Sequence, residues 1–148
     1  MSSAVENVAT KVGVAPVNAV VAMIRVRDVE RSAEFYKLLG FEIGNYVPRE
    51  CPPMHWAWLY QPQAANWKTG ANLMLVRGGE TGWDSPPDTH VTLYVYAADL
   101  VATRDRMLAA GVKCGAVSYP EYLPKGEFAA HDPDNYTVMV AQSYEQSP

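Results

Sequence analysis

Residues 20–41 read VVAMIRVRDVERSAEFYKLLGF, and residues 90–112 repeat the same pattern as HVTLYVYAADLVATRDRMLAAGV. Each copy predicts a strand, a helix that begins after an Asp and ends at a Gly, and a return to strand. The glycine follows the aspartate, Asp28 or Asp99, by the same number of residues in both copies. The duplication predicts two similar modules with a functional site between them, formed by inward-facing strand residues.

Further short strands follow each helix, so the expected order is βαβββ twice. In the second module these include a strand near residues 113–119. The stretch RGGETGWDSPPDT, which begins at Arg77, is rich in Gly, Pro and Asp and is typical of a linker. We expect a flexible N-terminal arm at 1–17, a first module at 18–77, a linker at 78–89, a second module at 90–143 and a tail at 144–148.

The composition is that of a globular domain. The chain has 148 residues, of which 49% are hydrophobic and 19% charged, and its formal net charge is −4. No basic cluster indicates nucleic-acid binding, and no apolar run or basic amphipathic helix indicates a membrane. Cys51 and Cys114 have no metal-ligand spacing and fall in different modules, which favours free thiols in the cytoplasm.

Two segments together resemble a known superfamily. The stretch RVRDVERS at residues 25–32, with Phe35-Tyr36 and Leu39-Gly40-Phe41 after it, resembles the opening of the vicinal oxygen chelate superfamily. This group includes glyoxalase I, the extradiol dioxygenases and the bleomycin-resistance proteins. The turn Asp132-Pro133-Asp134-Asn135-Tyr136 resembles its closing hairpin, with Asn135 where the family usually has glycine. The resemblance covers residues 18–143.

This resemblance implies an α+β fold in which two βαβββ modules form a pair of curled mixed-sheet half-barrels. It also implies a homodimer. In the metal enzymes of the family, the first and last strands of each module supply four ligands, usually His, Gln or Glu. The corresponding residues here are Val21 or Ala19, Asn72 or Met74, His90, and Met139.

Of these residues, His90 is the one conventional metal ligand. Divalent-metal sites need three or four converging N, O or S donors, and aliphatic or thioether groups do not bind hard cations. We therefore expect no metal and no other cofactor. This places the chain closest to the metal-free, bleomycin-resistance-like branch.

Strand alternation predicts which side chains line the cavity, because every second residue points to the same face. The candidate ligand-binding residues are His90, Thr92, Tyr94 and Met139 in the second module and Met23, Met74, Trp56 and Trp58 in the first. The sequence does not fix the inward face of the strand that carries the two tryptophans. An aromatic and thioether-rich surface suits a small molecule. A cationic planar ligand would gain about 0.5–2 kcal/mol from each aromatic face.

Several functions remain open at this point. The first is a small-molecule binding protein for an aromatic or amphipathic ligand. The second is a divalent-metal-dependent lyase, isomerase or dioxygenase, in which His55, Glu127 or His131 would join His90. A metal-free catalyst with His90 as its base is a third, and an interaction module whose cavity is filled by its own side chains is a fourth. His131, with Asp132 and Asp134 beside it, is interpreted as part of a solvated turn.

Overall fold

The computed structural model describes residues 13, 15–17, 19–66, 70–78 and 90–143. The expected linker and tail and most of the expected arm lie outside these residues, so the domain boundaries remain predictions. The elements in chain order are β1 (Met23–Val26), α2 (Val29–Lys37), β2 (Glu42–Val47), β3 (Trp56–Tyr60), β4 (Asn72–Arg77), β5 (Thr92–Ala97), α3 (Leu100–Ala109), β6 (Glu127–His131) and β7 (Thr137–Gln142).

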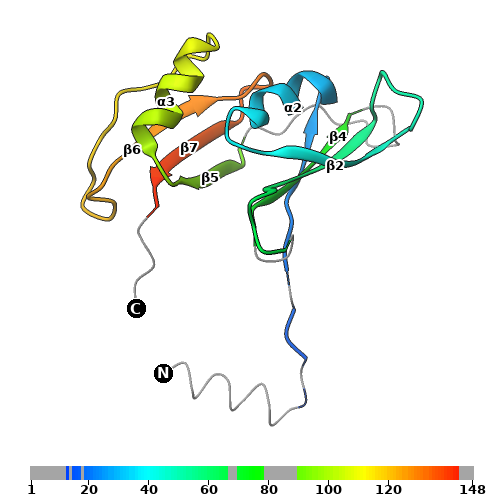
Figure 1. The fold of residues 1–148 in the computed structure, drawn as a ribbon, viewed down its shortest axis with the longest axis horizontal. Coiled ribbons are helices and arrows are strands. Elements are labelled where there is room, and N and C mark those ends of the chain that lie inside the picture. The colour runs from blue at the N-terminus through cyan, green and yellow to red at the C-terminus, as the bar shows by residue number, and fades with distance from the viewer. Residues whose placement is uncertain (1–12, 14, 18, 67–69, 79–89, 144–148) are drawn as a thin grey trace.

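These elements form two α+β modules, shown next to each other in Figure 1. The first contains a four-stranded sheet of order β1-β4-β3-β2, and the second a three-stranded sheet of order β5-β7-β6. Both sheets are mixed, because β1 pairs with β4 and β5 with β7 in parallel while the other neighbours are antiparallel. The predicted fold class is confirmed, as two open sheets without a closed barrel.

The helices begin and end where the repeated pattern predicts. Asp28 accepts a hydrogen bond from the backbone N–H of Arg31 at the start of α2, at 3.0 Å. Asp99 accepts the equivalent bond from Ala102 at the start of α3. Gly40 and Gly111 follow the helices at φ values of 93° and 87°. Only glycine takes this left-handed conformation without strain, so the two stop signals have a steric basis.

One predicted strand of the second module does not form. Residues 113–119 contact β6 through two isolated bridges, Cys114 with Ala130 and Ser118 with Glu127. The two bridges are four residues apart in this segment, at 114 and 118, but three residues apart in β6, at 130 and 127. The two segments therefore cannot form a continuous ladder in one register. The second sheet therefore has three strands in the described residues.

The closing turn of the second module is not solvated, contrary to expectation. His131 is exposed, but Asp132 and Asp134 have only 4% and 6% of their surface exposed. Asn135 has a φ of 72°, the left-handed conformation expected at this position. The two carboxylates are buried because the turn packs against the first module.

Three pairs of residues fix this contact between the modules. Asp134 Oδ1 accepts a hydrogen bond from Arg27 Nη1 at 2.9 Å, and its Oδ2 accepts one from the Arg27 backbone N–H at 3.1 Å. Tyr36 Oη donates to Asp132 Oδ2 at 2.6 Å. Tyr136 Oη donates to the Arg25 carbonyl oxygen at 2.8 Å. These polar groups are paired, so their burial stabilises the arrangement of the two modules.

Each sheet has one face that contributes to the hydrophobic core and a second face, here called its distal face. Leu73 and Leu75 of β4 are in the core, as are Val138 and Val140 of β7. The residues between them point to the distal face, because side chains alternate along a strand. The distal faces carry the residues singled out in the sequence.

Candidate functional site

The distal face of the second sheet is built from three cross-strand rows. These rows are Thr92, Thr137 and His131; Tyr94, Met139 and Ala129; and Tyr96, Ala141 and Glu127. Small residues, Ala129 and Ala141, leave room for large neighbours. The Tyr94 and Tyr96 rings are stacked with centroids 5.8 Å apart and planes 27° apart. The result is a tyrosine surface at the β5 edge of the sheet.

A buried carboxylate lies on the same face. Glu127 is 5% exposed, and its two oxygens accept hydrogen bonds from two tyrosines. Tyr94 Oη donates to Oε1, and Tyr122 Oη donates to Oε2 at 3.0 Å. The hydrogen bond to Glu127 raises the pKa of Tyr94, and burial adds to this shift. Tyr94 therefore stays protonated and holds its donor toward the carboxylate.

The distal face of the first sheet carries a second aromatic pair. Trp58 and Tyr60 are stacked with ring centroids 5.0 Å apart and planes 17° apart. Trp58 Nε1 donates a 2.6 Å hydrogen bond to Asn72 Oδ1, which fixes the indole orientation. The ring lies against Gly44 so closely that a Cβ there would overlap it. The orientation of the indole is thus fixed by contacts within the chain.

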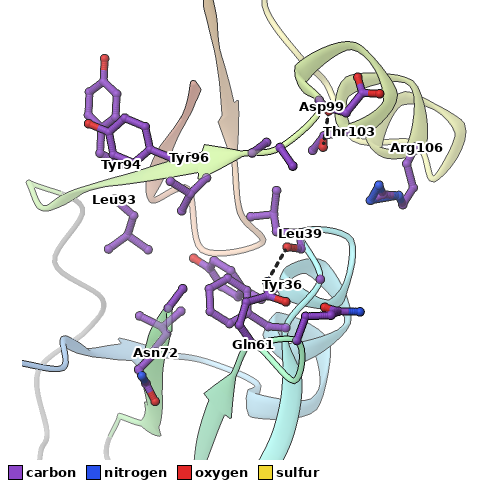
Figure 2. Close-up of a pocket in the computed structure, with 18 of the residues that line it drawn as sticks. Tyr36, Leu39, Gln61, Asn72, Leu93, Tyr94, Tyr96, Asp99, Thr103 and Arg106 are labelled. Atoms are coloured by element: carbon purple, nitrogen blue, oxygen red, sulfur yellow. Dashed lines mark hydrogen bonds between the residues drawn. The ribbon is translucent and has the colours of Figure 1, made fainter. Parts of the chain in front are cut away.

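A cleft of about 750 Å³ separates the two modules and is shown in Figure 2. Its apolar lining includes Leu39, Phe41, Leu93 and Val95. Tyr94 and Tyr96 border it, but Figure 2 shows their rings on the other side of β5 from Leu93. The tyrosine surface and the cleft are therefore adjacent but separate.

Three polar side chains that line the cleft are hydrogen-bonded within the chain. Gln61 Nε2 donates to the Leu39 carbonyl oxygen at 3.3 Å, and Thr103 Oγ1 donates to the Asp99 carbonyl oxygen at 2.8 Å. Arg106 Nη1 donates to the Leu38 carbonyl oxygen at 3.1 Å and so links the modules. Small-molecule sites usually combine apolar walls with a few polar groups aimed at the ligand. The tyrosine surface differs from the cleft because it carries a buried carboxylate, that of Glu127, among exposed tyrosine rings.

The structure divides the eight predicted ligand-binding residues between the two sheets. Thr92, Tyr94 and Met139 lie together on the distal face of the second sheet, and His90 is exposed just before β5. Met23, Met74 and Trp58 form one row of the first sheet, and Trp56 shares their face beside Val76. This places both tryptophans on the distal face, which the sequence left undecided. Whether these eight residues bind a ligand stays a prediction.

Glu127 and Tyr122 were not among the predicted ligand-binding residues. From the sequence, Glu127 is only an alternative metal donor. A signal for its position exists in the pairing of β6 with β7, because that register puts Glu127 and Met139 on one face. Tyr122 comes from the irregular segment before β6, and no periodic pattern predicts its orientation.

The residues at the family's metal positions do not fit a divalent cation. Met23 and Tyr94 each lie five residues before the aspartate that caps the following helix, so the two modules align without an insertion. Ala19 is then the counterpart of His90, and Met74 is the counterpart of Met139. One imidazole with an alanine and two thioethers makes no hard-metal site. Among the described residues, no group of three or more His, Cys, Asp or Glu is arranged to hold a metal ion.

Cys51 and Cys114 are free thiols, and burial raises the pKa of Cys114. Of the two described helices, neither is long and apolar enough to cross a lipid bilayer.

Comparison with known proteins gives a family match and several similar structures. A family model described as "Glyoxalase/Bleomycin resistance protein/Dioxygenase superfamily" matches residues 18–140. TioX from Micromonospora sp. ML1 is similar with a TM-score of 0.66 and 17% identity, over 85% of this chain and 98% of TioX. TnmS3, an antibiotic binding protein from Streptomyces sp. CB03234, has a TM-score of 0.63 and 21% identity, over 89% of this chain and 98% of TnmS3.

A bleomycin-binding protein complexed with bleomycin is also similar, with a TM-score of 0.58 and 19% identity, over 86% of this chain and all of that one (100%). At these identities the similarity shows a common fold. No curated protein matches the sequence.

Proposed function

Because this chain belongs to the Glyoxalase/Bleomycin resistance protein/Dioxygenase superfamily, we propose that it binds an aromatic or amphipathic small molecule without a metal. The observation that carries this proposal is the pair of oriented aromatic stacks on the distal faces. Trp58 with Tyr60 and Tyr94 with Tyr96 offer flat surfaces of the kind that planar ligands stack on. TnmS3, an antibiotic binding protein, and the bleomycin-binding protein in complex with bleomycin share this fold.

The experiment is a titration of the protein with a planar aromatic dye, followed by quenching of tryptophan fluorescence. Tyr94→Ala and Trp58→Ala should each weaken binding by about ten-fold, because each removes one stacking surface. Val101→Ala is the matched control, since Val101 is a 64% exposed side chain on α3. Equal affinities in all four proteins would contradict a site at the distal faces.

Metal content separates binding from the metalloenzyme alternative. The protein is purified without chelator, then incubated with Zn²⁺, Ni²⁺, Mn²⁺ and Fe²⁺, and its bound metal is measured. We expect dye binding to be the same before and after this treatment. One tight metal per chain that is lost in His90→Ala would instead favour a metal-dependent lyase, isomerase or dioxygenase.

The same proposal includes a cytoplasmic homodimer. β1 and β5 are edge strands of their sheets, and apolar side chains near them are exposed, among them Val20 at 89% and Tyr96 at 63%. Unpaired edges with exposed apolar residues are usually covered by another surface. Light scattering coupled to gel filtration gives the mass in solution, and a monomer would contradict the dimer.

A mixing experiment then locates the site. In a dimer whose sites each combine the first module of one chain with the second module of its partner, Trp58→Ala and Tyr94→Ala chains form heterodimers with one intact site. Co-expression of the two variants should then restore tight dye binding to some of the sites. No restored binding would place each site within one chain.

A further inference from the structure

We infer that Glu127 makes this site selective for ligands that carry a positive charge next to an aromatic ring. The inference rests on the proposed function, because it names the ligand class of the same surface. The Glu127 carboxylate lies on the tyrosine surface rather than in the apolar core. In the cross-strand row, Glu127 and Tyr96 flank Ala141.

Two hydroxyl groups hold the carboxylate in place without neutralising it. Tyr94 donates to one oxygen and Tyr122 to the other. A carboxylate has about four acceptor positions, so two bonds leave further acceptor capacity on both oxygens. A buried charge is costly unless a charged partner compensates it. The Arg27–Asp134 and Lys37–Glu34 ion pairs do not involve Glu127.

The surrounding rings add to the attraction for a cation. Tyr94, Tyr96 and Tyr122 are 40%, 63% and 70% exposed, so their faces are accessible beside a 5% exposed carboxylate. A cation over a tyrosine face gains about 0.5–2 kcal/mol, most when it is desolvated. The strand residues of this distal face, in the three rows described above, include no lysine or arginine. Charge and ring faces therefore select the same ligand, an aromatic cation.

Glu127 has an alternative role as an anchor for the segment that carries Tyr122. A purely structural anchor would change the binding of charged and uncharged ligands by the same factor. A recognition group would change the binding of the cation alone. The test therefore compares two ligands of similar shape and different charge.

The probes are thioflavin T, a cationic planar dye, and its uncharged analogue that lacks the ring N-methyl group. We expect the wild-type protein to bind the cation at least about ten-fold more tightly than the uncharged dye. Glu127→Gln keeps the shape and one acceptor oxygen but removes the charge. It should remove most of that preference while changing the affinity for the uncharged dye by less than about two-fold.

Glu121→Gln is the matched control, because Glu121 is an exposed carboxylate on the same segment and its loss changes the net charge equally. It should leave the preference unchanged. An equal loss for both dyes in Glu127→Gln would overturn the inference.

If Glu127→Gln does not fold, the affinities of the wild-type protein for the two dyes still test the charge selectivity. Equal affinity for the two dyes would overturn the charge selectivity and leave the aromatic site intact. Binding of neither dye would contradict the proposed function itself.

Discussion

Tyr36 and Asp132 form a 2.6 Å hydrogen bond that joins the helix of the first module to the closing turn of the second. Tyr36 is 1% exposed and Asp132 is 4% exposed, so the bond is shielded from water. Asp132 Oδ1 also accepts the backbone N–H groups of Asp134 and Tyr136, each at 2.9 Å. The carboxylate therefore shapes its own turn with one oxygen and binds the other module with the second.

Tyr36→Phe should lower the free energy of unfolding by about 1–3 kcal/mol, because a buried carboxylate loses a donor. Burial, together with the charge of Asp132, raises the pKa of Tyr36 above that of an unfolded tyrosine. Its contribution to stability is thus complete below about pH 10 and declines as the unfolded chain ionises above it. Urea denaturation at pH 8 and pH 10.5 should show the gap between wild type and variant narrowing at the higher pH.

Tyr119→Phe is the control for this comparison, since Tyr119 is 68% exposed and should lose little stability on substitution. A gap between wild type and Tyr36→Phe that stays constant with pH would show that Tyr36 ionises alike in both states.

Asp132→Asn should change how stability depends on pH. Burial raises the pKa of Asp132, although hydrogen bonds from Tyr36 and the backbone oppose the shift. A raised pKa means that this group favours folding below its unfolded pKa of about 3.9 and loses that contribution as the pH rises through the folded value. Asparagine does not ionise, and its oxygen can still accept both backbone bonds.

The stability of Asp132→Asn relative to wild type should therefore improve between pH 4 and pH 7, as measured by urea denaturation. A relative stability that worsens over this range would mean that the folded protein favours the charged carboxylate.

Arg27 and Asp134 should contribute unequally to stability although they form one ion pair. The Arg27 side chain is 68% exposed and that of Asp134 is 4% exposed. Arg27→Ala removes one solvent-screened bond and should cost at most about 1 kcal/mol. Asp134→Ala also leaves the Arg27 backbone N–H without its acceptor, and should cost about 2–3 kcal/mol. Equal costs in chemical denaturation would show that the exposed guanidinium carries the interaction.

The local parts of the fold were predictable from the sequence. Asp28 and Asp99 begin the helices and Gly40 ends the first one, because caps and left-handed stops depend on neighbouring residues alone. Alternation also placed Thr92, Tyr94 and Tyr96 on one face, since parity within a strand is independent of the partner strand.

The parts that depend on distant partners were not predictable in the same way. Asp132 and Asp134 are ordinary turn residues in the sequence. They are buried because they contact Arg27 and Tyr36, which lie about a hundred positions earlier in the chain. Glu127 accepts a hydrogen bond from Tyr122. Tyr122 lies in an irregular segment, so no periodic pattern in the sequence predicts this contact.

Gly44→Ala tests whether the β2 backbone seats the Trp58 indole. An alanine Cβ at this position would overlap the ring atoms Cζ3 and Cε3 of Trp58, so we expect the indole to move and its hydrogen bond to Asn72 to weaken. We expect a shifted tryptophan emission spectrum and roughly ten-fold weaker dye binding, because a displaced ring no longer offers the same stacking face. Gly115→Ala is the matched control, since its Cβ would meet only Ala129 backbone atoms at 3.7 and 3.9 Å. If Gly44→Ala retained the wild-type emission and affinity, β2 would yield to the methyl group and Trp58 would not depend on this glycine.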